Sequence, residues 1–179
     1  MTLRSFGVIA AVGAAALLWT ARPRDEGGAY DDYFRSLNEA LRQSGPARPS
    51  LVLDLDRLDR NIAVLTQSIR PPKHYRVVDK SLPSIPLIEY LFAHAHTDRV
   101  MCFSQPFLNV VAERLPRADL LLGKPMPVRA AEEFYRRLRG DFDPSRQLQW
   151  LIDTPERLEE YRRLGDTLGQ PIVIDNRSG

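Results

Sequence analysis

Residues 75–175 repeat one pattern of hydrophobic and polar positions. Each repeat opens with a short, mostly apolar run, passes through a polar turn, and continues into a longer segment with apolar residues three or four positions apart. The short runs are typical of buried strands, and the wider spacing is typical of amphipathic helices. The pattern predicts five strands, at residues 75–80, 100–104, 118–123, 148–152 and 171–175.

Prolines and capping residues mark the starts of the helices between these strands. Ser84 and Pro86 begin one helix, Pro106 begins the next, and Thr154 caps a later helix with Pro155 in its first turn. A proline is tolerated there because the first N–H groups of a helix have no internal partner.

Residues 51–55 form a further apolar run, which predicts another strand. Asp56 is expected to cap the following helix, and Pro71 and Pro72 end that segment. The apolar positions of this helix are Leu58, Ile62, Leu65 and Ile69.

Strands that alternate with helices predict an α/β fold with a parallel sheet and right-handed crossovers. No strand is followed by a Gly-x-Gly-x-x-Gly turn, so a dinucleotide-binding sheet is disfavoured. The strands recur at about the unit length of a (β/α) barrel, which closes with eight strands. We therefore expect a partial (β/α)8 (TIM-like) barrel of about five βα units, with unpaired edge strands through which the chain forms homo-oligomers.

The segment before this domain differs in composition. Residues 6–21 are uncharged and resemble the hydrophobic region of a signal peptide or a short anchor. We expect a membrane-anchored or exported protein of a bacterial inner membrane or periplasm; whether the segment is cleaved and which way it is oriented stay open. The expected domains are residues 1–28 as signal or anchor segment and linker, 29–49 as a short helix (30–43) and linker, and 50–179 as the barrel part.

Composition excludes several other function classes. The net charge is +2 and no basic run is interleaved with aromatic residues, so no nucleic-acid partner is expected. Cys102 is the single cysteine, which excludes an internal disulfide and a cluster of thiolate metal ligands. Only three residues are lysines, namely Lys73, Lys80 and Lys124.

Lys80 is the main candidate for chemistry. It ends the strand at residues 75–80, and open α/β sheets and barrels bind their ligands at the carboxyl ends of strands. An amine that the strand partly desolvates can lose its proton and attack a carbonyl group to form a Schiff base. The alternative is a surface lysine at the rim of a loop, and the spacing alone does not exclude it.

Three stretches resemble one known family. Residues 51–61 (LVLDLDRLDRN), 118–125 (ADLLLGKP) and 149–156 (QWLIDTPE) resemble the alanine racemase-like N-terminal domain, in the branch of D-threonine aldolases and D-serine dehydratases. These are fold type III pyridoxal phosphate enzymes. The resemblance covers residues 50–175.

The resemblance implies that Lys80 is the catalytic and cofactor-binding lysine, which forms a Schiff base with pyridoxal phosphate. The cofactor then withdraws electrons from the α-carbon of a small amino acid, and Lys80 becomes a candidate base. The implied reaction is racemisation, retro-aldol cleavage (a lyase) or dehydration of a D-amino acid. Which of these applies, and on which amino acid, is left open.

The chain also departs from the family pattern. Val78 stands where these enzymes carry a histidine two residues before the lysine. The remaining barrel strands, the cofactor phosphate site and the C-terminal β-domain are expected to be absent, as in a truncated enzyme. No metal site is expected, because the family's metal ligands come from that part.

Other polar residues have plainer expected roles. Lys124 also ends a strand and is the rival Schiff-base lysine or a pocket residue. Asp79 should point away from Lys80 and form an outer salt bridge, and His74 should face solvent. Asp153 ends a strand at the rim where chemistry is expected; capping of the next helix explains it as well as a catalytic role does, and we expect capping. Asp175 is similar.

Two histidines lie close together in the sequence. His94 and His96 are two positions apart on a helix and therefore face different ways, so they should not share a metal ion.

Two further hypotheses stay open beside the enzyme. The chain is a membrane-anchored, inactive remnant or binding module, or it is a pyridoxal phosphate carrier of the single-barrel type. The carrier is disfavoured because that type needs a whole barrel.

Overall fold

The structure is a computed structural model that describes residues 13, 17, 19, 20 and 27–175. It divides into two units, Met1–Val52 and Leu53–Gly179. The first unit contains the amphipathic helix α2 (Asp32–Ser44), which confirms the helix predicted at residues 30–43. The Asp31 carboxylate caps α2 by accepting a hydrogen bond from the N–H of Phe34 at 2.9 Å.

The predicted anchor at residues 6–21 falls almost entirely outside the described residues. Among the helices that the structure describes, none has the length and hydrophobicity that crossing a membrane requires.

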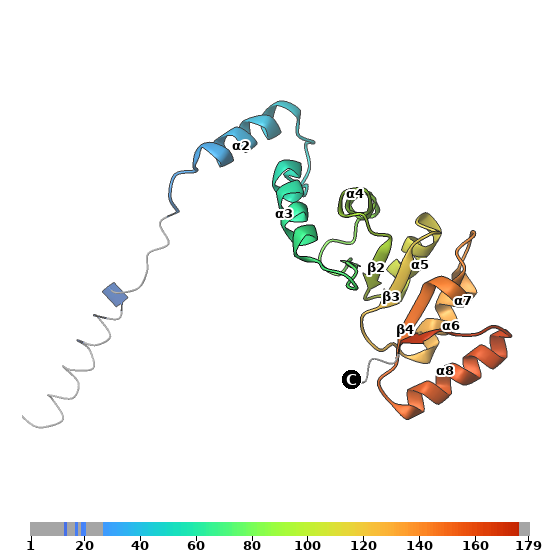
Figure 1. Ribbon diagram of the computed structural model, residues 1–179. Coiled ribbons are helices and arrows are strands. Elements are labelled where there is room, and N and C mark those ends of the chain that lie inside the picture. Colours follow the sequence, from blue (N-terminus) through green and yellow to red (C-terminus); the bar gives the residue numbers. More distant parts are fainter. Residues whose placement is uncertain (1–12, 14–16, 18, 21–26, 176–179) are drawn as a thin grey trace, which may run out of the picture. The chain divides into compact units, whose positions relative to one another are not determined.

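The second unit is a mixed α/β domain built on a five-stranded parallel sheet, as predicted (Figure 1). The strands lie in chain order, β1-β2-β3-β4-β5, and helices connect them. The strands are β1 (Val77–Val78), β2 (Arg99–Cys102), β3 (Asp119–Leu122), β4 (Leu148–Leu151) and β5 (Ile174–Asp175). The helices are α3 (Leu55–Ser68), α4 (Ile85–Ala95), α5 (Gln105–Arg114), α6 (Val128–Arg137), α7 (Pro144–Gln147) and α8 (Pro155–Leu168).

One face of the sheet packs against helices, and we call it the helix face. Its residues pair in register across four strands and share one hydrophobic core with α4, α5, α6 and α8. From the strands this core takes Val77, Val100, Cys102, Leu120, Leu122, Leu148 and Trp150. Because side chains alternate along a strand, Val78, Met101 and Leu121 lie on the other face, which we call the second face. Val78 is 50% exposed there.

Arg76, which precedes β1, contacts β2 and β3 at the amino end of the second face. Arg76 donates to the backbone carbonyls of Val100 at 3.2 Å and Asp119 at 2.7 Å, and it pairs with the Asp119 carboxylate at 2.9 Å. Arg99 lies 3.7 Å from the same carboxylate. No sequence pattern predicted this network, because Arg76 and Asp119 are 43 residues apart.

The strand predicted at residues 51–55 is wrong. Residues 51–54 are not part of any strand, Leu51 is 83% exposed, and Leu55 already begins α3. Asp54, not Asp56, caps this helix by accepting a hydrogen bond from the N–H of Arg57 at 2.9 Å. An apolar run becomes a strand only where a neighbouring strand pairs with it, and the described part of the chain places none beside these residues.

Candidate functional site

Lys80 lies just beyond the carboxyl end of β1, as predicted. The N–H of Asp79 still donates to the Met101 carbonyl at 3.2 Å, and the chain then bends at Lys80. The Lys80 amine lies 5.5 Å from the centroid of the Phe103 ring, within cation–π distance. Lys80 is exposed, so the expectation that the strand desolvates its amine is wrong.

Phe103 follows β2, and the position of its ring depends on Gly123, which follows β3. The N–H of Gly123 donates to the Cys102 carbonyl at 2.9 Å, so the two strand ends remain adjacent. A Cβ atom at Gly123 would overlap the Phe103 ring and would lie 2.8 Å from the Met101 sulfur. Glycine therefore leaves the space that the ring occupies beneath the Lys80 amine.

A pocket of about 370 Å³ opens at these strand ends. Its lining comes from the segments after β1, β2 and β3, and includes both Lys80 and Lys124. Phe103 and Phe107 give it aromatic surface, and Ser104 places the start of α5 at its wall. The structure thus brings the two strand-end lysines to one site, which sequence spacing alone did not show.

Asp79 is buried, in contrast to the outer salt bridge that we expected. It is only 3% exposed and forms no ion pair within the described residues. The alternation of side chains explains the difference, because Asp79 follows Val77 toward the helix face. The strand partner there is Cys102, whose thiol hydrogen-bonds with the carboxyl group.

Burial sets the ionisation of both groups. Desolvation raises the pKa of Asp79, and the hydrogen bond with Cys102 opposes this in part. Desolvation also raises the pKa of the Cys102 thiol strongly, so Cys102 stays protonated and does not act as a nucleophile. Asp79 Oδ2 is buried and has no hydrogen-bond partner in the described part of the chain, although Asp79 lines the pocket.

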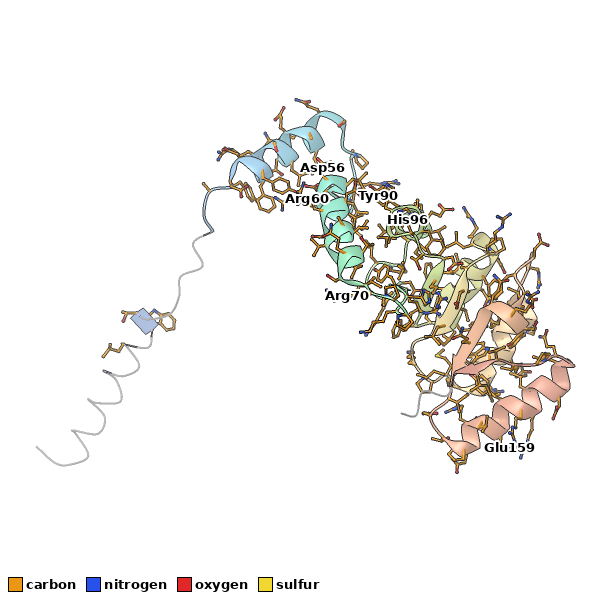
Figure 2. All side chains as sticks on the ribbon, in the orientation of Figure 1. Asp56, Arg60, Arg70, Tyr90, His96 and Glu159 are labelled. Carbon is orange, nitrogen blue, oxygen red and sulfur yellow. The ribbon has the colours of Figure 1, made fainter. Side chains whose placement is uncertain are left out.

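The histidines lie away from this site. His94 stacks on Tyr90 at 3.8 Å between ring centroids, and its Nδ1 lies 2.8 Å from the Tyr90 carbonyl oxygen. Figure 2 shows Tyr90 on α4, with His96 at the end of that helix. His74 is exposed, as predicted. No group of three residues able to bind a metal occurs among the residues that the structure describes.

The capping role expected for Asp153 is wrong. The hydroxyl of Thr154 caps α8, as predicted, by accepting a hydrogen bond from the N–H of Arg157 at 3.1 Å. Asp153 instead lies 3.8 Å from the Arg157 guanidinium. The side chain of Asp175 lies outside what the structure describes.

Phe103, Phe107 and Gly123 belong to the site but were not predicted from the sequence. Side chains two positions apart on a strand lie on the same face, so Phe103 shares the second face with Met101. By the same alternation Lys80 shares that face with Val78. That alternation was the signal that could have found Phe103. The overlap at Gly123 needed coordinates, because it depends on two side chains from another strand.

Comparison of the chain with protein-family models, with curated proteins and with solved structures found no match. The resemblance to the alanine racemase-like domain therefore stays a prediction.

Proposed function

We propose that this chain is the lysine-bearing, N-terminal part of a pyridoxal phosphate-dependent enzyme that acts on D-amino acids, as a racemase, an aldolase-type lyase or a dehydratase. Lys80 is the residue that condenses with the aldehyde of the cofactor. The observation that carries this proposal is the position of the Lys80 amine at the carboxyl end of a parallel sheet, in a pocket with an aromatic wall.

We propose further that the sheet is part of a (β/α)8 barrel. The chain order of its five strands supports this, because a doubly wound sheet reverses its strand order. The helix face supports it too, since right-handed crossovers that always advance in one direction leave all helices on one side.

The pocket residues fit the cofactor. Lys80 supplies the amine for its aldehyde, and Phe103 and Phe107 supply apolar surface for a planar ring. When bound, pyridoxal phosphate withdraws electrons from the α-carbon of an amino acid.

The Lys80 amine has two proposed roles, as a nucleophile and as a base. The neutral amine would be the nucleophile toward the aldehyde of the cofactor, with the aldehyde oxygen leaving as water. As a free amine, Lys80 would act as the base that takes a proton from the α-carbon of the substrate. The Phe103 ring lies 5.5 Å from this amine, measured to the ring centroid, and helps to position it.

Trapping with borohydride tests the proposal. Borohydride reduces a C=N bond to a stable secondary amine, and peptide mass spectrometry then locates the modified lysine. With only three lysines in the chain, the assignment is unambiguous. We expect modification at Lys80, its loss in Lys80→Ala, and its retention in Lys73→Ala, because Lys73 lines a different pocket. Modification at Lys124 instead would transfer the role to the rival lysine.

The exposure of Lys80 favours a second candidate function, an inactive remnant or binding module without catalysis. That candidate predicts no site-selective adduct, so that all three lysines react with pyridoxal phosphate slowly and alike.

Two proposals concern location and assembly. We propose that residues 6–21 anchor or export the protein, because their run is uncharged. We also propose a homo-oligomer, since β1 and β5 each pair on one side only within the described sheet, and such edges invite pairing.

A further inference from the structure

The proposed chemistry makes no use of α2, the helix of the first unit. This 13-residue helix is amphipathic, and none of its residues is buried. One side carries Phe34, Leu37 and Leu41, which we call the apolar face of α2. Phe34 is 48% exposed and Leu41 is 38% exposed. An amphipathic helix is stable when its apolar side is covered, so this face requires an apolar surface to cover it.

An aromatic ring continues the apolar face at the start of the helix. Tyr30 is exposed, precedes α2, and lies 6.2 Å from Phe34 between ring centroids. Tyrosine is enriched at the boundary between lipid and water, because its ring is apolar and its hydroxyl group is polar. This end of α2 therefore has the composition of a membrane interface.

The charges within α2 balance. The helix contains two acidic residues, Asp32 and Glu39, and two basic residues, Arg35 and Arg42. Asp32 pairs with Arg35, and Glu39 accepts a hydrogen bond from Gln43 Nε2 at 2.8 Å. The helix has no net charge of its own, so its binding should depend on apolar area and should not require anionic lipid.

Two further observations favour a membrane surface over a second copy of the helix. A coiled coil needs about three or four heptads of apolar repeats, and the 13 residues of α2 supply fewer than two. Residues 22–31 connect the uncharged run at residues 6–21 to α2. Such a connection extends to at most about 36 Å, so a membrane that holds the run lies within reach of α2.

We infer that α2 lies in the plane of a membrane surface, with Phe34, Leu37 and Leu41 against the lipid acyl chains and its charged side chains in water. The inference is independent of Lys80 and its chemistry. It rests on the proposed anchor only for bringing α2 to the membrane.

Spin labels on the full chain, reconstituted into phosphatidylcholine vesicles, test the inference. The label is placed at Leu37→Cys, on the apolar face, or at Glu39→Cys, about 200° around the helix. Cys102 is buried and should react little, and the unsubstituted chain treated with the same reagent measures any background. Oxygen and a water-soluble nickel chelate are compared as relaxing agents, because oxygen concentrates in lipid and the chelate stays in water.

We expect the label at Leu37→Cys to be relaxed mainly by oxygen and to lie about 5–10 Å within the boundary of headgroups and acyl chains. The label at Glu39→Cys should be relaxed mainly by the nickel chelate. Equal nickel access at the two positions would show that α2 lies in water and would overturn the inference. Low access of both agents at Leu37→Cys would show that protein covers the face, and would also overturn it.

A triple variant separates the inference from the proposed anchor. Leu37→Cys with Phe34→Ser and Leu41→Ser removes the apolar face but leaves residues 6–21 unchanged. We expect nickel access at its label to rise to the level of Glu39→Cys, while the chain still floats with the vesicles in a density gradient. Unchanged nickel access would overturn the inference, because the apolar face would then not hold the helix in lipid.

Flotation distinguishes the two failures. If the triple variant no longer floats, α2 and not residues 6–21 holds the chain, so the anchor proposal fails and the inference stands. If the chain floats and nickel reaches Leu37→Cys without the serine changes, the anchor proposal stands and the inference fails.

Discussion

The Lys80 amine lies 5.5 Å from the centroid of the Phe103 ring, although 23 positions separate the two residues in the chain. They follow the neighbouring strands β1 and β2, so the parallel pairing of these strands brings them together. A cation over an aromatic face at an exposed site contributes about 0.5–1 kcal/mol.

A double-mutant cycle measures this interaction. We expect Lys80→Met and Phe103→Leu to show a coupling of about 0.5–1 kcal/mol in the free energy of unfolding, from urea denaturation. The matched cycle of Lys124→Met with Phe103→Leu should show no coupling. Equal coupling in both cycles would mean that Phe103 senses net charge and not the position of Lys80.

Gly123→Ala should destabilise the second unit by about 1–3 kcal/mol, because the added methyl group overlaps the Phe103 ring. Urea denaturation measures the loss. Gly28→Ala is the control, since a Cβ there meets no atom within 4 Å.

Adding Phe103→Leu to Gly123→Ala should recover part of that loss, because leucine lacks the far end of the ring. If the double variant is less stable than the sum of the single changes predicts, overlap with Phe103 is not the cause.

Asp79→Asn should make stability less dependent on pH. The folded chain holds the Asp79 proton to higher pH than the unfolded chain does, since burial raises the pKa of this carboxyl group. Its contribution to stability is complete below the unfolded pKa and is lost as pH rises through the folded pKa. Asparagine does not titrate. The free energy of unfolding of the variant, relative to that of the wild type, should therefore increase from acid toward neutral pH.

Urea denaturation at several pH values measures that difference in unfolding free energy. Asp153→Asn serves as the control for exchanging a carboxylate for an amide at an exposed position. If the stability of Asp79→Asn relative to the wild type is highest at acid pH and decreases toward neutral pH, folding lowers the pKa of Asp79 and the expectation is wrong.

Arg76→Ala should destabilise the sheet by about 1–3 kcal/mol, because it removes the donor to two backbone carbonyls and to Asp119. The Arg76 side chain is only 12% exposed, so water replaces these bonds poorly. Arg136→Ala breaks the exposed pair with Glu133 and should change stability by less than about 1 kcal/mol. Similar losses for both variants in thermal or urea unfolding would show that Arg76 acts only as a surface charge.

Much of the fold followed from short-range pattern. The apolar runs at residues 100–104, 118–123 and 148–152 predicted β2, β3 and β4, and Thr154 with Pro155 predicted the start of α8. These features are local, because a buried strand needs consecutive apolar residues and a helix start needs one capping side chain. The same reasoning failed at residues 51–55, where the apolar run has no strand beside it in the described chain.

Two features of the site were readable from the chain before any coordinates: Lys80 ends a strand, and the domain alternates strands with helices. Both depend on neighbours in the sequence. The exposure of Lys80, the burial of Asp79, and the pocket that Lys80 shares with Phe103 and Lys124 came only from the folded arrangement. Those outcomes depend on which strand lies beside which and on the face that the helices cover. Such contacts join residues that are far apart in sequence, and no local pattern encodes them.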